Sequence, residues 1–270
     1  MTQVALITGG AGAIAAALGD RLAARGYQLI LVDVDAGRLA AAASRLPGAK
    51  TILSDLTDAG DLERVAGIVA QTPDLTLLVN NAGIIRPGDV SALPFADIGV
   101  QIDVNLNAPL RLIHAAAGRF KAAGSGCILC IVSAAAFAAL PGSAAYSAAK
   151  FGLRGFLIAL NHELAPHGVR VRGVFPGAVD TPMLRYEATH GGSPLNFLNK
   201  DVLSAGEVAE GCLRAIDGKR LETLLPASDS FLLRLVSAYP ALMTPLLPYL
   251  ERAGRRGLDR YVKSRGLAAE

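Results

Sequence analysis

The sequence TGGAGAIA occupies residues 8–15 and follows directly on the apolar run 4–8. Glycines at such a junction let the chain turn tightly from a buried strand into a helix, and they let a pyrophosphate approach the backbone amides at the helix N-terminus. This stretch therefore predicts a strand, a loop and a helix that open a dinucleotide-binding fold. The residues expected to contact the dinucleotide here are Gly9, Gly10, Gly12 and Ile14.

Short apolar runs alternate with longer alanine-rich stretches along the rest of the chain. This alternation is typical of βαβ units and predicts an α/β fold, a Rossmann-like doubly wound parallel sheet of about seven strands with helices on both faces. Strands are expected at residues 4–8, 28–33, 50–53, 76–80, 127–132, 170–175 and 222–225. Helices are expected at residues 13–25, 36–45, 59–71, 95–122, 144–165 and 206–217. We expect a single domain over residues 1–229 and a C-terminal extension over residues 230–270.

Tyr146 and Lys150 are four residues apart, so they share one face of the helix expected at residues 144–165. A nearby ammonium favours the phenolate, and the tyrosine is then expected to exchange protons closer to neutral pH. Ser133 follows the apolar run 127–132, so its hydroxyl is expected at the carboxyl end of a strand. The sequence therefore predicts a site that transfers a proton at the same edge of the sheet as the glycine-rich loop.

These motifs, in this order, resemble those of the classical short-chain dehydrogenase/reductase family from about residue 4 to about residue 183. The resemblance implies that Tyr146 is the general acid or base and that Ser133 holds the substrate oxygen. It also implies that Lys150 binds the nicotinamide ribose and that Asn105 supports a water path from Lys150 to solvent. The activity that the resemblance implies is hydride transfer between a secondary alcohol and a nicotinamide cofactor.

Three further segments match cofactor contacts of the family. Asp55-Leu56 resembles the pair that contacts the adenine, and residues 80–83 resemble the turn that passes close to the cofactor. Residues 176–181 match the loop after the sixth strand. The cofactor contacts that the resemblance implies in these segments are Asp55, Leu56, Asn81, Ala82, Gly83, Pro176, Val179 and Thr181.

Asp33 ends the second expected strand about twenty residues after the glycine-rich loop. A carboxylate there accepts hydrogen bonds from both hydroxyls of the adenosine ribose and repels a 2′-phosphate. The sequence therefore predicts NAD as the cofactor, with NADP less favoured. The alternative is that Asp33 only caps the following helix.

Ala13 and Ala15 stand where the glycine-rich loop of classical members usually carries glycines, and each adds a Cβ. Gly10 and Gly12 still provide a workable loop in the G-x-G-x-x-A register. Two alternatives to the NAD-dependent enzyme stay open. One is a catalytically weak, nucleotide-responsive binding or scaffold protein, and the other is an NADPH-dependent carbonyl reductase, against which Asp33 argues.

Residues 184–204 resemble the mobile segment that closes over the substrate in the family. The apolar side chains in this segment favour a small hydrophobic alcohol or ketone as the substrate. Arg185 and Lys200 keep an acidic substrate possible.

The extension over residues 230–270 is rich in leucine but interrupted by prolines, and its final 20 residues carry six basic and three acidic side chains. Such a segment does not span a bilayer. It is expected to lie on an anionic membrane, to wall a lipophilic substrate pocket, or to cover a subunit partner. Resemblance to the family implies a homodimer or homotetramer.

The whole composition excludes several other classes. Among 270 residues, 26 basic and 23 acidic side chains give a net charge of only +3, so no nucleic-acid partner is expected. A strand that begins by Val4 leaves no room for a signal peptide, and we expect a cytoplasmic protein, with peripheral contact to the membrane left open. The three cysteines are expected in the core. The four histidines show no ligand-like spacing, so no metal site is expected.

Overall fold

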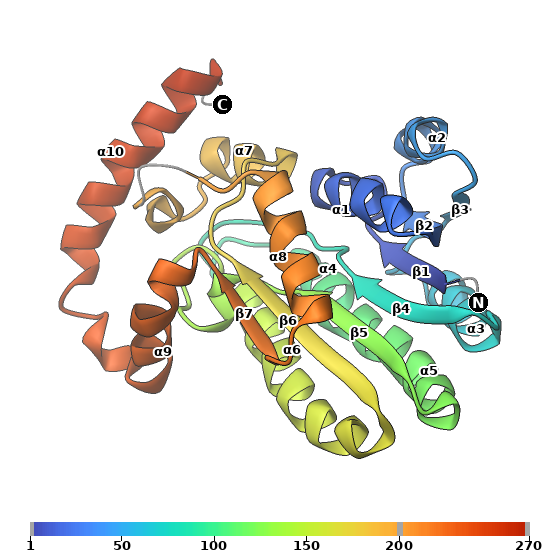
Figure 1. Ribbon diagram of the computed structural model, residues 1–270. Coiled ribbons are helices and arrows are strands. Elements are labelled where there is room, and N and C mark those ends of the chain that lie inside the picture. The colour runs from blue at the N-terminus through green and yellow to red at the C-terminus, as the bar shows by residue number, and fades with distance from the viewer. Residues whose placement is uncertain (1–2, 199–201, 268–270) are drawn as a thin grey trace.

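The computed structural model describes residues 3–198 and 202–267 of the chain. Within these residues, seven parallel strands form one sheet in the order β3-β2-β1-β4-β5-β6-β7 (Figure 1). The strands are β1 Gln3–Thr8, β2 Tyr27–Asp33, β3 Lys50–Leu53, β4 Leu75–Asn80, β5 Gly126–Ile131, β6 Val169–Pro176 and β7 Glu222–Leu225. The strand order reverses between β1 and β4, which is where ligands bind in open parallel sheets. The predicted doubly wound parallel sheet is confirmed.

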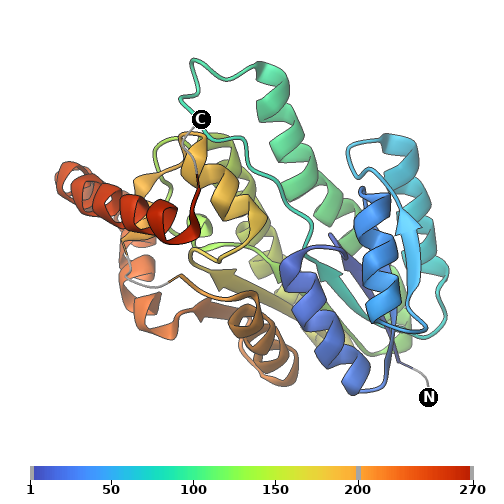
Figure 2. The same cartoon turned by 90° about the horizontal axis from the view of Figure 1, so that it is seen from above.

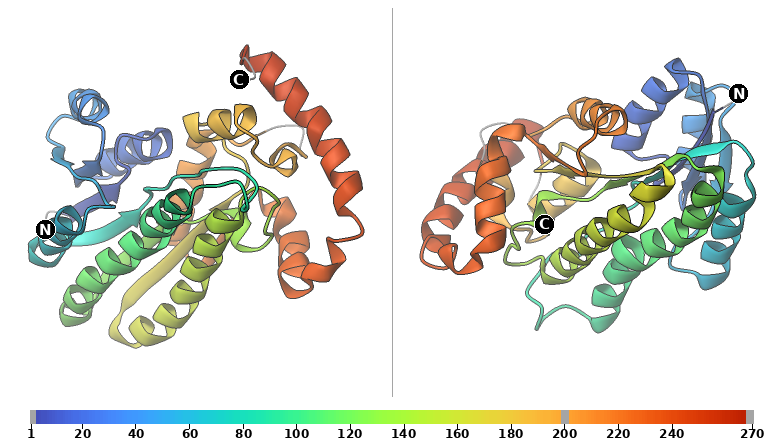
Figure 3. Two further views of the ribbon diagram at one scale, coloured as in Figure 1. Left: turned by 180° about the vertical axis from the view of Figure 1, so that it is seen from behind. Right: turned by 60° about the horizontal axis from the view of Figure 1, so that its bottom comes forward.

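Helices cover both faces of the sheet (Figures 1 and 3). Apolar residues of α1, α2 and α8 form one core cluster with the sheet, and apolar residues of α3, α5 and α6 form the other. The helices are α1 Ala13–Ala24, α2 Ala36–Arg45, α3 Ala59–Gln71, α4 Phe95–Ile102, α5 Ala108–Ala123, α6 Ala144–Leu164, α7 Pro182–Thr189, α8 Ala205–Asp217, α9 Ser230–Ala238 and α10 Leu247–Arg265. Cys127, Cys130 and Cys212 are buried in this core, as expected.

The prediction of a single helix at residues 95–122 is wrong, because a π-helical turn over Asp103–Asn107 separates α4 from α5. Pro109 has no N–H with which to bind the carbonyl of Asn105. In addition, the Asn105 side-chain amide donates to the Gln101 carbonyl at 2.8 Å. Both features disturb the regular α-helical ladder at this point, and π-turns are frequent at functional sites.

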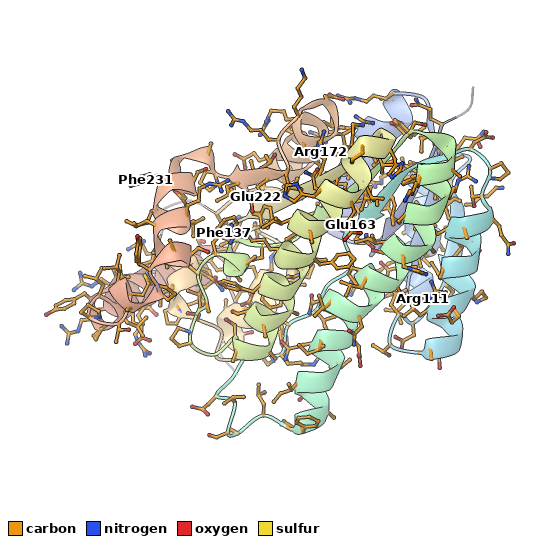
Figure 4. All side chains as sticks on the ribbon, turned by 90° about the horizontal axis from the view of Figure 1, so that it is seen from below. Arg111, Phe137, Glu163, Arg172, Glu222 and Phe231 are labelled. Atoms are coloured by element: carbon orange, nitrogen blue, oxygen red, sulfur yellow. The ribbon has the colours of Figure 1, made fainter. Side chains whose placement is uncertain are left out.

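Residue Glu222 on β7 joins the C-terminal extension to the sheet. Its carboxylate accepts hydrogen bonds at 2.7 Å from Arg154 of α6 and from Arg234 of α9. The Arg154 guanidinium also lies 3.7 Å from the centroid of the Phe137 ring. Figure 4 labels Glu222 and Phe137 beside α6, and Phe231 on α9 at the outer edge.

Helix α10 packs against the short 3-10 helix η4, Pro194–Phe197. Two glycines make this close approach possible, because a Cβ on Gly254 would lie 2.3 Å from the Pro194 carbonyl oxygen and one on Gly257 would lie 1.9 Å from that of Phe197. The Tyr261 hydroxyl also donates to Asp180 at 2.8 Å. Figure 2 shows α10 along the outer edge of the molecule. Among the described residues, no helix combines the length and the apolar character needed to cross a bilayer.

Candidate active site

The glycine-rich loop lies against the end of β4. Gly9 has a φ of +59°, and a Cβ on it would lie 2.9 Å from the Ala82 Cα. The Asn81 side-chain amide donates to the carbonyls of Thr8 and Gly9 at 3.1 and 3.0 Å. The Thr8 hydroxyl in turn accepts from the backbone N–H groups of Asn81 and Ala82, each at 3.1 Å. Hydrogen bonds thus hold the glycine-rich loop and the turn after β4, both predicted to contact the cofactor, side by side at the carboxyl edge of the sheet.

The N-terminus of α1 fits an anionic group. Gly12 is the N-cap residue, and in the described part of the chain no side chain caps this helix and no acidic residue lies in its first turn. The backbone N–H groups of a first helical turn then remain to bind an anion such as a pyrophosphate. The glycine cradle at Gly9 and the helix end at Gly12 together suit the phosphates of a dinucleotide.

Asp33 lies at the end of β2, and its carboxylate accepts hydrogen bonds from the N–H groups of Ala11 at 3.0 Å and of Asp35 at 3.2 Å. The residue that caps α2 is Asp35, whose side chain accepts from Arg38 N–H at 2.9 Å. Asp33 therefore braces the glycine-rich loop and does not cap the helix. Its carboxylate is partly exposed beside that loop.

Asp55 is held in a turn after β3. Its carboxylate accepts from both the N–H and the hydroxyl of Thr57, at 2.9 and 2.7 Å. Leu56 packs against the core. Neither residue lines the cavity described next, so an adenine contact at this position stays a prediction.

A cavity of about 370 Å³ opens at the carboxyl ends of the strands. Of the predicted site residues, those that line it are Ile14, Asn81, Gly83, Ser133, Tyr146, Lys150, Pro176, Val179 and Thr181. Those that lie outside its wall are Gly9, Gly10, Gly12, Asp33, Asp55, Leu56, Ala82 and Asn105. The structure thus brings the three residues of the proposed proton-transfer site together on one wall.

Asn105 is fully buried in the π-helical turn. Its side chain accepts from Ile84 N–H at 3.3 Å and donates to the Ile84 carbonyl at 2.8 Å. Gly83 lies between this amide and Lys150, since a Cβ on Gly83 would lie 3.0 Å from Asn105 Oδ1 and 3.6 Å from Lys150 Nζ. The water path implied for Asn105 stays a prediction.

Burial shifts the pKa values of the two key groups on α6. It lowers the pKa of Lys150 to about 8. It raises the pKa of Tyr146, the nearby Glu187 carboxylate raises that pKa further, and a hydrogen bond with Ser133 lowers it. In the protein alone the pKa of Tyr146 is therefore raised, and not brought toward neutrality as expected from Lys150, because burial removes the phenol from water.

The family model for short-chain dehydrogenases matches residues 3–191. The chain belongs to this family. D-threitol dehydrogenase of Mycolicibacterium smegmatis is 32% identical over 186 residues, which are 67% of this chain and 72% of the relative. The bulky-bulky ketone specific alcohol dehydrogenase from Comamonas testosteroni has a TM-score of 0.75 at 30% identity, with 90% of this chain and 94% of that chain covered. A short-chain dehydrogenase from Sphingobium yanoikuyae in complex with NADPH has a TM-score of 0.78 at 30% identity, with coverage of 90% and 95%.

Membership of the short-chain dehydrogenase family makes the protein an oxidoreductase that uses a nicotinamide cofactor. Its two alanines in the glycine-rich segment differ in their surroundings. Ala15 is fully buried and packs in the core under α1, whereas Ala13 is exposed at the start of that helix. The Ala15 methyl therefore points away from the phosphate side of the loop.

The sequence left one feature of this short-chain dehydrogenase undecided and missed another. The undecided feature is the role of the C-terminal extension, which lines the cavity through Leu232, Leu233, Val236, Met243 and Leu250. Of the three roles left open for the extension, the pocket wall is the one that the structure contains. The proline-interrupted leucine pattern allowed this role but did not select it.

The feature that was missed is Glu187 on α7, which lines the cavity and is only 9% exposed. It follows Met183 by four residues and shares its helix face, which is the signal that could have indicated it. Arg185, by contrast, pairs with Asp180 at 3.2 Å. Within the segment 184–204, residues 199–201, and so Lys200, lie outside the described residues.

Proposed function

We propose that this short-chain dehydrogenase uses NAD to interconvert a secondary alcohol and a ketone on a hydrophobic substrate, with Tyr146 as the general acid or base. The observation that carries the proposal is the arrangement of Ser133, Tyr146 and Lys150 on one wall of the 370 Å³ cavity. Ile14 and Asn81, which adjoin the glycine-rich loop, line the same cavity, and most of its other lining side chains are apolar.

Each catalytic side chain has a separate task. When bound, the nicotinamide supplies or accepts the hydride. Ser133 donates a hydrogen bond to the substrate oxygen and holds it within reach of Tyr146, which gives its proton to that oxygen during reduction and takes one from it during oxidation. Lys150, whose pKa is about 8, is mostly protonated at pH 7, so its charge stabilises the phenolate left on Tyr146.

The apolar walls support a hydrophobic substrate. Side chains from four separate segments contribute, and they are Ile85, Leu140, Leu184, Leu195, Leu198, Leu232, Val236 and Leu250. The similar enzyme from Comamonas testosteroni is described as specific for bulky-bulky ketones, which agrees with such a cavity. The similar D-threitol dehydrogenase is named for a polyol. What the two relatives share is therefore the interconversion of an alcohol and a carbonyl group, and not the polarity of the substrate.

Asp33 supports NAD over NADP. Its carboxylate, fixed by the N–H groups of Ala11 and Asp35, would repel a 2′-phosphate on the adenosine ribose. The Sphingobium relative was solved with NADPH, so an NADPH-dependent carbonyl reductase is the second candidate.

Fluorescence titration with NADH and separately with NADPH tests the choice of cofactor, and turnover of a panel of hydrophobic secondary alcohols with NAD tests the reaction. We expect saturable NADH binding at least tenfold tighter than NADPH binding. Tighter NADPH binding would favour the carbonyl reductase. Absence of binding to either would favour the nucleotide-responsive scaffold protein.

We also propose that the enzyme is a homodimer or homotetramer that associates through α5 and α6. Phe151 and Ile158 of α6 support this, because they are 38% and 36% exposed on a helix that otherwise covers the core. Light scattering coupled to size-exclusion chromatography measures the molecular mass. A mass of about one 27.9 kDa chain would contradict the proposal.

We further propose that the protein is cytoplasmic and makes peripheral contact with an anionic membrane. The exposed apolar side chains of the extension are Phe231, Leu232, Leu235, Tyr239, Leu242, Leu246 and Tyr249. Exposed arginines of α10, among them Arg252 and Arg255, add positive charge. Sedimentation with vesicles that contain phosphatidylserine, compared with neutral vesicles, tests this contact. Equal recovery with both, or with neither, would contradict it.

A further inference from the structure

Glu187 places a carboxyl group in the wall of a largely apolar cavity. It belongs to α7, is 9% exposed, and neighbours the cavity-lining side chains of Met183 and Leu195. Glutamate is among the residues least often buried without a partner, so its presence here is not explained by packing.

Within residues 3–198 and 202–267, one hydrogen bond to this carboxyl group is formed. The Asn196 side-chain amide donates to Glu187 Oε1 at 3.1 Å, and in the described residues no lysine or arginine forms an ion pair with Glu187. Oε2 accepts no hydrogen bond from the described residues, and it is not one of the fully buried polar atoms that lack a partner, so it is not fully enclosed by the protein. A purely structural hydrogen bond between α7 and η4 therefore explains Oε1 of the carboxyl group but does not explain Oε2.

The carboxyl group also lies close to the reaction site. Its negative charge is one of the causes that raise the pKa of Tyr146. Burial raises the pKa of Glu187 itself to about 7, while the hydrogen bond from Asn196 lowers it. Near neutral pH both protonation states are populated, so the group can accept a hydrogen bond in one state and donate one in the other.

We propose that Glu187 is a specificity-determining residue that hydrogen-bonds a second hydroxyl group on an otherwise hydrophobic alcohol or ketone, a role that rests on the proposed function. A hydroxyl group both donates and accepts, so it pairs with the carboxylate and with the carboxylic acid. An ammonium group would pair only with the carboxylate, and a second carbonyl only with the acid. The preferred substrate is therefore a hydroxyketone or the corresponding diol.

The test measures binding without turnover. Calorimetry with the full chain in the presence of NAD compares 2-octanone with hydroxy-2-octanones that carry the hydroxyl at one of the three positions furthest from the carbonyl. We expect the wild-type protein to bind the best hydroxyketone about tenfold more tightly than 2-octanone. Glu187→Leu is expected to abolish this ratio, and Glu187→Gln, whose amide also donates and accepts, to retain part of it.

Asn196→Ala is the matched control, because it removes the tie between α7 and η4 but leaves the carboxyl group in the cavity. A merely structural role for Glu187 predicts that Glu187→Leu and Asn196→Ala weaken both ketones equally. That result, or equal affinities in the wild-type protein, would overturn the proposal. Reduction of the same ketones with NADH is measured separately and reports on the proposed function, so the two can fail independently.

Discussion

The ammonium nitrogen of Lys150 lies 5.2 Å from the centroid of the Tyr146 ring, one turn away along α6. Lys150 is only 3% exposed, and burial moves the pKa values of the two side chains in opposite directions, each toward its neutral form. Burial of the two charged forms is therefore unfavourable and lowers the free energy of unfolding. That cost is typical of catalytic groups, whose protonation states matter more than their contribution to stability.

Tyr146→Phe is expected to reduce kcat by about 100-fold to 10,000-fold, because it removes the proton donor and little else. The affinity for NADH should change by less than about twofold, since the ring and its packing remain. Tyr186→Phe is the control, because Tyr186 stacks on His190 with ring centroids 4.0 Å apart and does not line the cavity. Activity of Tyr146→Phe equal to that of the control would exclude Tyr146 as the acid.

Lys150→Met is expected to abolish activity and to stabilise the fold at pH 7. The pKa of Lys150 falls from 10.5 to about 8 on burial, so the unfolded chain binds the proton more tightly than the folded protein. Buried Lys150 therefore lowers the free energy of unfolding of the wild-type protein by about 3 kcal/mol below about pH 8. This effect disappears as the pH rises toward 10.5. Urea unfolding at pH 7 and pH 10 measures it. A variant less stable than wild type at pH 7 would contradict this account.

The strands and most of the site could be predicted because their signals are local. Apolar runs between glycines located the strands to within about one residue, and Tyr146 with Lys150 needed only helical spacing. The break at Asn105 has a local signal in Pro109, which lacks an N–H, but the hydrogen bonds from the Asn105 side chain to Gln101 and Ile84 are formed only in the folded chain. The burial of Glu187 could not be predicted either, because it depends on the packing of α7 against η4 in the folded chain.

Glu187 is also expected to make the stability of the protein depend on pH. Its folded pKa of about 7 lies above the ordinary 4.5, so the folded protein binds the proton more tightly. The free energy of unfolding should therefore fall, by up to about 3 kcal/mol, as the pH rises from about 4.5 through 7. Glu187→Gln should lack this decline. Parallel unfolding curves for variant and wild type from pH 5 to pH 8 would disprove the contribution.

Asp33→Ala is expected to weaken NADH binding and, combined with Val34→Arg, to shift the preference toward NADPH. The first change removes the carboxylate, and the second adds a cation for the 2′-phosphate at a position that is 64% exposed. Val34→Arg alone is the control, because it keeps the repelling carboxylate. If the double variant retains the wild-type ratio of affinities in a fluorescence titration, ribose recognition lies elsewhere.

Gly257→Ala is expected to separate α10 from the 3-10 helix η4. The added Cβ would lie 1.9 Å from the Phe197 carbonyl oxygen, which is backbone, so the helix itself has to move. Because α10 and η4 both line the cavity, through Leu250 and Leu195, we expect KM to rise at least about tenfold with a smaller effect on kcat.

The control for this change is Gly118→Ala in α5, where a Cβ meets no atom within 4 Å. That substitution should stabilise the protein slightly, since alanine favours a helix over glycine by up to about 1 kcal/mol. Steady-state kinetics on a hydrophobic ketone distinguishes the two variants. Equal KM values would mean that the contact between α10 and η4 holds the chain together without shaping the cavity, and that the extension acts through α9 alone.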